Sequence, residues 1–378
     1  VAPPLGLAVD AIASILVGRL SPLIATACLV SGALGLWRSI DGGRGDVRAL
    51  TFAPSVEAGA CACGGPLLWL ASGLLHAECV RWAGRRAEAT RRLFNDALGE
   101  KRLADVAAAR PTAPLLSRAL HPCAFQYRHH CVERVAVPDG DTMDMWPAPN
   151  IEGDCQRIFV FIHGGAWKAG TSRMNPVILL PHRLSASGWH VYVVNYRKKR
   201  WPEHLSDCRA ALRFVQRRHG ASGRVVLGGA SAGGHLAALL ACEETSPPLA
   251  GIVLSYPAID PGDELKQYVP FPCIGLSTMR WFFELVVLRG DRTWWAEVSP
   301  LAQLAPRFPP CLLVHGVIDG LVPLASSRKF MEALARTRPC ESDLLIEVPG
   351  AKHAFEHGGG ALVDVVNDGI VAWLQGID

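Results

Sequence analysis

The feature that most constrains the fold is a glycine-rich turn between an apolar run and a helical run. Residues 225–227 (Val-Val-Leu) lead into residues 228–234 (Gly-Gly-Ala-Ser-Ala-Gly-Gly), and a helix-like run continues from His235 to Cys242. Small residues allow a strand and a helix to close around one serine, whose backbone is then strained. We expect this turn to push the Ser231 hydroxyl outwards, although glycine-rich turns without chemistry share the pattern.

A second motif follows another apolar run and offers backbone donors. Residues 158–162 (Ile-Phe-Val-Phe-Ile) are typical of a buried central strand, and they end in residues 163–167 (His-Gly-Gly-Ala-Trp). Consecutive glycines let N–H groups turn towards a site, where they can stabilise an oxyanion. The predicted donors are Gly165 and Ala166 together with Ala232, while a plain connecting turn is the alternative.

An acid and a base follow two further predicted strands. Asp319 lies in the loop after residues 311–315, and His353 lies in the loop after the strand predicted at residues 343–348. A serine needs a histidine base and an acid that orients the histidine, and the carboxyl ends of parallel strands meet at one edge. The sequence therefore predicts a catalytic triad of Ser231, Asp319 and His353.

Three other residues compete for these roles. Asp260 follows the apolar run at residues 252–254 and is the alternative acid. His315 and His357 are alternative bases, but His315 falls at a strand end and His357 in a glycine-rich stretch. We therefore rank both histidines below His353.

These motifs resemble those of the α/β-hydrolases, in which the triad follows the same serine, aspartate, histidine order. The resemblance covers about residues 130–376 and rests on five segments, at residues 163–167, 195–197, 231–235, 319–323 and 350–355. Within the family, the chain is most similar to hormone-sensitive-lipase-like carboxylesterases, including actinobacterial membrane-associated esterases and prenylcysteine methylesterases. The resemblance implies ester hydrolysis through an acyl-enzyme.

The chain departs from the larger esterase pattern at one position. Ala166 stands where a third glycine often follows the histidine. A backbone N–H is the donor, so alanine can still supply it. The shorter H-G-G-x-W pattern is shared by carboxylesterases, aryl formamidases and carbohydrate esterases, and it indicates the reaction class better than the substrate.

Strands and helices alternate through the second part of the chain. Six predicted strands, at residues 158–162, 189–196, 224–228, 251–255, 311–315 and 343–348, are separated by segments long enough for crossover helices. This pattern predicts an α/β fold with a doubly wound, mostly parallel sheet. We place the catalytic domain at residues 126–378, with a cap insertion at about 261–300 whose aromatic residues favour an apolar lid and acyl pocket.

The first 125 residues differ in composition and are predicted to be helical. Residues 20–37 carry no charge, and residues 58–77 contain His76 but no Asp, Glu, Lys or Arg. Each run approaches the roughly 20 residues that cross a bilayer, which predicts two transmembrane segments. A buried helical hairpin is the alternative. A signal peptide fits less well, since no short basic start precedes residues 20–37.

Basic residues give the orientation of this hairpin. Three arginines lie between the two runs, and five follow the second, at residues 81, 85, 86, 91 and 92. The excess predicts membrane association with the catalytic domain in the cytoplasm. Residues 85–102 are expected to form a basic linker helix, either solvated or lying on an anionic surface.

Charge and cysteine spacing exclude other classes of function. A net charge of +4 over 378 residues is too small to indicate nucleic-acid binding, and the twelve cysteines show no zinc-binding spacing. We predict neither a metal nor an organic cofactor.

The predicted function is a serine carboxylesterase that acts on a small-molecule, apolar ester. An amidase, an aryl formamidase and a prenylcysteine methylesterase are alternatives with the same triad. A ligand-binding protein on a hydrolase fold is a remoter alternative.

Overall fold

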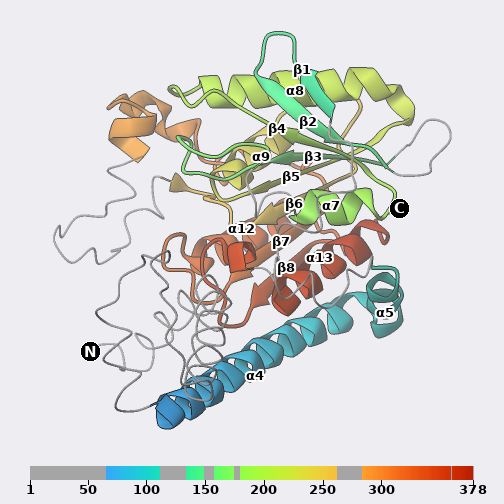
Figure 1. Ribbon diagram of the computed structural model, residues 1–378. Helices are drawn as coiled ribbons and strands as arrows, with labels where there is room; N and C mark the ends of the chain where they lie inside the picture. Colours follow the sequence, from blue (N-terminus) through green and yellow to red (C-terminus); the bar gives the residue numbers. More distant parts are fainter. Residues whose placement is uncertain are drawn as a thin grey trace, which may run out of the picture. The chain divides into compact units, whose positions relative to one another are not determined.

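The fold is seen in a computed structural model that describes residues 65–110, 133–148, 157–173, 179–261, 283–358 and 360–377. Contacts divide the chain into two compact units, residues 1–85 and 86–378. The second unit holds the sheet, and it begins upstream of the domain boundary expected at residue 126. Figure 1 shows the elements and their order.

Among the described residues, eight strands form one sheet in the order β1-β2-β4-β3-β5-β6-β7-β8. The antiparallel edge consists of β1 (Glu133–Ala136) and β2 (Thr142–Trp146), which pairs with β4 (His190–Val194). The other strands run parallel: β3 (Arg157–Ile162), β5 (Arg224–Ala230), β6 (Gly251–Ser255), β7 (Cys311–Gly316) and β8 (Leu344–Val348). The six predicted strands are therefore found, and the predicted mostly parallel sheet is confirmed.

Alternating side chains of the central strands fill two cores. In β3, Ile158, Val160 and Ile162 belong to one buried cluster, while Phe159 and Phe161 belong to the other. A continuous apolar run is what a strand covered on both faces requires. The sheet is thus sandwiched between two helical layers.

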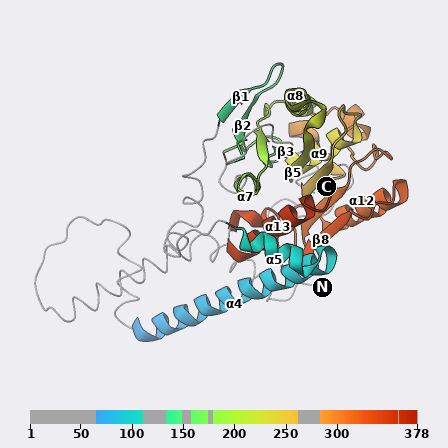
Figure 2. The same cartoon turned by 90° about the vertical axis from the view of Figure 1, so that its right-hand side faces the viewer.

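Helices cover both faces of the sheet (Figure 2). One face carries α8 (Glu203–His219), α9 (Ala232–Cys242) and α12 (Leu324–Thr337). The other carries α7 (Leu179–Ser185) and α13 (Gly360–Leu374). Short turns of helix complete the described elements: η3 (Gly220–Ser222), η4 (Phe283–Val287), η5 (Arg292–Ala296) and η6 (Phe355–Gly358).

Two helices precede the sheet in the chain, α4 (Gly65–Leu98) and α5 (Glu100–Ala108). Within the second unit, Phe94 at the end of α4 is fully buried against Gly369 of α13. Leu103 and Val106 of α5 join the same buried cluster as α13. The predicted basic linker helix is therefore part of a longer helix whose carboxyl end packs on the hydrolase fold.

The structure describes only part of the two predicted membrane spans. Residues 20–37 lie outside the described residues, and so do residues 58–64 of the second span. The rest of the second span belongs to α4, which continues without a break through Arg81, Arg85 and Arg86. None of the helices in the described ranges is both long and apolar enough to cross a membrane.

Candidate active site

Ser231 lies in the sharp turn between β5 and α9, as the glycine-rich motif predicts. Its φ is 55° and its ψ is −121°, and its N–H donates to the carbonyl of Ser255 on the neighbouring strand at 2.9 Å. Gly233 makes the turn possible, because a Cβ there would lie 2.1 Å from the carbonyl oxygen of Ile162. The strained turn leaves the Ser231 side chain at the carboxyl edge of the sheet.

His353 joins Ser231 and Asp319 in a chain of hydrogen bonds. Its Nε2 lies 2.8 Å from the Oγ of Ser231, and its Nδ1 lies 2.7 Å from the Oδ2 of Asp319. The His353 side chain is 15% exposed, and that of Asp319 is fully buried. The three residues predicted from the sequence are thus brought together from loops that are far apart in the chain.

The loop that carries Asp319 holds its carboxylate from several sides. Backbone N–H groups of Leu321 and Val322 each donate to Oδ1 at 2.9 Å, and the Nε2 of His315 lies 3.4 Å from Oδ2. Burial alone would raise the pKa of this carboxyl, but hydrogen bonds from His315 and His353 outweigh it and hold the pKa well below its usual range. Asp319 is therefore a fixed negative charge beside the imidazole.

His315 supports the acid and makes no contact with the serine in this arrangement. Its Nε2 donates to the carbonyl of Val322 at 3.0 Å, and its Nδ1 lies 2.8 Å from the Oγ of Ser327. The sequence indicates His315 only as an alternative base. Asp319, rather than Asp260, accepts the hydrogen bond from His353.

Tyr256 lies beside His353, the predicted base. The sequence motifs did not reveal this neighbour. Its ring centroid lies 4.7 Å from that of His353 at an interplanar angle of 62°, and 5.8 Å from that of Phe355. The side chain is buried and the backbone φ is 36°, a strained value for tyrosine. The one available signal is its place directly after β6, at the same edge of the sheet as the triad.

The predicted oxyanion donors lie in the loop after β3 and at the start of α9. Gly165 has a φ of 127° and Ala166 a φ of 50°, so the loop turns back on itself beside the serine turn. Neither N–H donates a hydrogen bond within the described residues. Ala232 is the first residue of α9, where N–H groups have no partner inside the helix. Backbone hydrogen bonds of this loop and of α9 therefore leave the N–H groups of the three predicted donors unused.

Trp167 ties the oxyanion loop to the helix that follows the serine. Its indole N–H donates to the Nδ1 of His235 at 3.1 Å, and the Nε2 of His235 donates to the carbonyl of Val298 at 2.7 Å. Burial lowers the pKa of His235 to about 4, so the imidazole is neutral near pH 7. This bond fixes the left-handed backbone of Ala166 and Trp167, whose φ values are 50° and 60°.

His163 begins the same loop and is fully buried. Its Nδ1 donates to the carbonyl of Gly164 at 2.7 Å, and its ring stacks on Tyr196 with centroids 4.6 Å apart. Burial lowers the pKa of His163 to about 4. The histidine is thus a neutral packing element of the loop.

The described part of the cap insertion packs on this loop. Phe283 is fully buried, and its ring lies 4.6 Å from Trp167 and 5.6 Å from Trp295. Trp294 lies 6.5 Å from Trp201. These aromatics attach the insertion to the body of the fold, while the insertion residues 262–282 lie outside the described residues.

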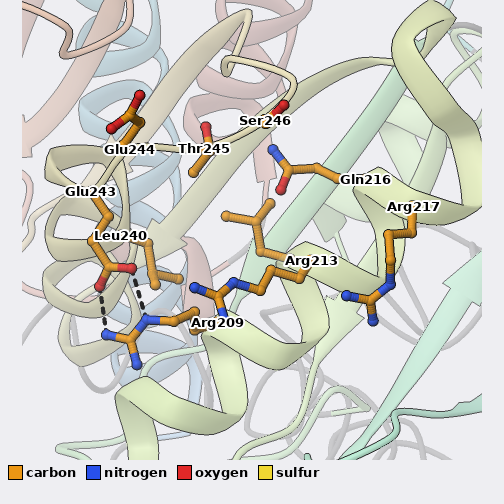
Figure 3. A pocket seen from close by; sticks show the side chains of 10 residues that line it. Arg209, Arg213, Gln216, Arg217, Leu240, Glu243, Glu244, Thr245 and Ser246 are labelled. Carbon is orange, nitrogen blue, oxygen red and sulfur yellow. Dashed lines mark hydrogen bonds and ion pairs between the residues drawn. The ribbon is translucent and has the colours of Figure 1, made fainter.

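A cavity of about 300 Å³ lies elsewhere, between α8 and the segment after α9 (Figure 3). It is lined by Arg209, Arg213, Arg217, Glu243 and Thr245, among others, and Arg209 donates to Glu243 at 2.7 Å. No triad residue lines it. Across the described ranges, no group of three His, Cys, Asp or Glu side chains is arranged to hold a metal.

Comparisons with known proteins agree with this fold. Residues 159–357, just over half of the chain, match the protein family described as alpha/beta hydrolase fold. The chain belongs to this family.

Relatives within the family are named as esterases. The chain is 27% identical over 272 residues to Esterase LipC of Mycobacterium tuberculosis, covering 67% of each chain. It is 28% identical over 242 residues to Probable carboxylic ester hydrolase LipM of the same organism, covering 58% of this chain but only 54% of LipM. These matches confirm the predicted kinship with carboxylesterases, and with it the enzyme class of a hydrolase.

A solved structure shares the fold. An esterase from the bacterial hormone-sensitive lipase family superposes with a TM-score of 0.54 and 21% identity, covering 73% of this chain and 97% of that one. At this identity the likeness shows a common architecture only.

Proposed function

We propose that the protein hydrolyses carboxylic esters through an acyl-enzyme formed on Ser231. The observation that supports this is the chain of hydrogen bonds from the Ser231 Oγ through His353 to Asp319, at 2.8 and 2.7 Å. Nucleophile, base and orienting acid are then already within hydrogen-bond reach before a substrate binds.

In the acylation step, the Nε2 of His353 takes the proton of Ser231 while Oγ forms a bond to the ester carbonyl carbon. The carbonyl electrons move to oxygen, and the N–H groups of Gly165, Ala166 and Ala232 donate to that oxyanion. When the intermediate collapses, the bond to the alcohol breaks and His353 returns the proton to the leaving oxygen.

Water completes the cycle by the same route. His353 takes a proton from water as it attacks the acyl carbon, and it returns that proton to Ser231 as the acid leaves. Asp319 keeps Nδ1–H in place throughout, since its carboxylate stays ionised over the working pH range.

A fluorophosphonate probe tests this proposal directly. Intact mass spectrometry of the labelled wild-type protein should show one adduct, and peptide mapping should place it on Ser231. Ser231→Ala should remove both the adduct and the hydrolysis of p-nitrophenyl acetate. A wild-type protein that forms no adduct would favour the non-catalytic ligand-binding alternative.

The substrate is a narrower question than the reaction. Relatives include Isoprenylcysteine alpha-carbonyl methylesterase ICME of Arabidopsis thaliana, 26% identical over 258 residues, and Kynurenine formamidase avaC of Aspergillus versicolor, 35% identical over 103 residues. We propose an apolar ester, on the ground that the sequence of the cap insertion is rich in aromatic residues, at positions 281–283, 294 and 295. Hydrolysis rates for p-nitrophenyl esters of rising chain length, an aryl formamide and a prenylcysteine methyl ester would separate these classes.

Membrane association and a cytoplasmic catalytic domain stay predictions from the sequence. They now depend on residues 20–37, which carry no charge. Fractionation of cells that express the chain with and without these residues would test both predictions. If both forms of the protein are found in the same fraction, residues 20–37 do not hold the protein at a membrane.

A further inference from the structure

The turn that leads into the His353 loop is held by a residue of α4. The Nε of Arg86 donates to the carbonyl of Pro349 at 3.0 Å, although the two residues are 263 positions apart. Arg86 lies upstream of residues 159–357, which match the hydrolase family. The contact therefore joins a helix outside the matched segment to the loop that carries the proposed base.

The geometry of this turn explains why the bond matters. The N–H of Ala351 donates to the carbonyl of Val348 at 3.2 Å, and the φ of Gly350 is 61°. Proline followed by a glycine of positive φ is typical of a type II turn. Types I and II differ by a flip of the central peptide, whose carbonyl is that of Pro349. Arg86 thus holds the orientation that distinguishes one turn from the other.

The side chain of Arg86 also lies against the turn. A Cβ on Gly350 would be 3.1 Å from the Nε of Arg86 and 3.4 Å from its Cδ. Two neighbours on α4 secure the helix, because Ala87 is buried in the same cluster as Ala351 and Thr90 is fully buried. The guanidinium is thereby presented to Pro349 by a fixed element.

The loop beyond the turn depends on such anchors. Ala354, directly after His353, has a φ of 54°, which is costly for a residue with a Cβ. One further anchor is the N–H of Ile318, which donates to the carbonyl of Ala351 at 3.1 Å. A strained loop keeps its shape only when its surroundings fix it, and the imidazole must stay within hydrogen-bond reach on both sides.

We propose that Arg86 is a positioning residue for His353: it holds the Pro349–Gly350 peptide in the orientation that places the imidazole between Ser231 and Asp319. This inference rests on the proposed function. Helix α4 then contributes to turnover without touching substrate, because its arginine sets the start of the loop that carries the base.

The test compares Arg86→Ala with the wild type in p-nitrophenyl acetate hydrolysis and in the rate of fluorophosphonate labelling. Small displacements of a catalytic group cost up to about 100-fold, so we expect kcat and the labelling rate to fall roughly 10- to 100-fold. KM should stay within about twofold, because Arg86 does not contact the substrate site. Arg86→Lys should restore most of kcat, since an ammonium can also donate to the Pro349 carbonyl.

Two further variants keep the test decisive. Arg92→Ala is the matched control, because Arg92 lies on the same helix, is 73% exposed and pairs with Glu88. It should leave kcat at the wild-type value. Gly350→Ala should lower kcat as Arg86→Ala does, since a side chain there disfavours the turn and crowds the guanidinium.

The two proposals fail in different ways. If the wild type forms no adduct on Ser231, the proposed function is wrong. If the wild type reacts but Arg86→Ala keeps kcat per folded molecule, with folding followed by circular dichroism, the positioning role is wrong. If Arg86→Ala does not fold, the other two variants decide. An unchanged kcat in both Arg86→Lys and Gly350→Ala overturns the positioning role of Arg86. A kcat that falls in Gly350→Ala alone supports that role.

Discussion

Two regions of the fold are stabilised in different ways. The loops at the carboxyl edge of the sheet contain strained backbone and polar contacts, whereas the helices that precede the sheet pack through apolar side chains. Ser231, Ala166 and Ala354 in the loops have positive φ values, and the triad side chains are held by hydrogen bonds. The segment from Phe94 to Val106 instead buries apolar side chains against α13. Strained, polar loops are the proposed place of the chemistry, whereas the apolar side chains of the segment from Phe94 to Val106 contribute stability. Substitutions in the loops should therefore change activity, and apolar substitutions in this segment should change stability.

The largest effect should come from the nucleophile. Ser231→Ala removes the oxygen that we propose attacks the carbonyl, and loss of a triad serine costs on the order of 10⁶-fold in kcat. Hydrolysis of p-nitrophenyl acetate measures it, with Ser222→Ala as control, because Ser222 is exposed and precedes β5 at the opposite end of the strand. Thermal unfolding should be almost unchanged. A variant that keeps activity would place the chemistry elsewhere.

The acid gives the next effect. Asp319→Asn retains the shape of the side chain but removes the charge that orients His353, and we expect kcat to fall about 10⁴-fold. Asp260→Asn should remain close to the wild type, because Asp319 holds the imidazole. Steady-state kinetics of the pair decide between the two acids, and the reverse pattern would reassign the role to Asp260.

Phe94→Ala should show the opposite behaviour from these two variants. The ring is fully buried, and loss of a buried phenylalanine costs about 3–5 kcal/mol of unfolding free energy. Urea unfolding measures this, and kcat of the folded fraction should be retained. Leu93→Ala is the control, because the neighbouring side chain is 37% exposed and should cost far less. Lost kcat at full stability would contradict the separation of the two regions.

Buried histidines make stability depend on pH. Burial lowers the pKa of His163, His204 and His235 to about 4, so the unfolded chain binds more protons between about pH 6.5 and 4. Their contribution is complete above pH 6.5 and is lost as the pH falls towards 4. For His235, the contribution to the unfolding free energy is about 3 kcal/mol. The unfolding free energy of His235→Gln should differ less between pH 7 and pH 4.5 than that of the wild type. An equal difference in both proteins would show that His235 does not contribute to the pH dependence.

The smallest effect concerns strain in the oxyanion loop. Ala166 has a φ of 50°, a left-handed conformation that glycine adopts without the steric cost of a Cβ. Ala166→Gly should therefore raise the unfolding free energy by up to about 1 kcal/mol. Ala169→Gly, in the same loop without a positive φ, should lower it. Urea unfolding of both variants tests this, and two changes of the same sign would refute the strain.

The central strands and the juxtaposition of Ser231, Asp319 and His353 were predictable because their signals are local. Each of the six predicted strands is an apolar run, and Ser231, Asp319 and His353 each follow such a run. The parallel topology then brings the strand ends together. Strands β1 and β2 were missed, because β1 is a largely exposed edge strand and β2 carries the buried Asp144. Neither has the continuous apolar pattern that marks a central strand.

Contacts that connect distant segments could not be predicted in this way. Tyr256 meets His353 because two loops converge, and Arg86 reaches Pro349 from α4. Nothing in the immediate sequence of these residues distinguishes them from ordinary loop or surface positions. Their roles depend on tertiary distance.

The bond between Trp167 and His235 also constrains how the sequence can evolve. An indole donor and an imidazole acceptor, both buried, face each other at 3.1 Å, and the imidazole reaches on to Val298. A change at either position alone leaves a polar group without its partner in a dry interior. Substitutions at positions 167 and 235 should therefore be inherited as pairs, and this correlation would record the contact in any set of descendant sequences.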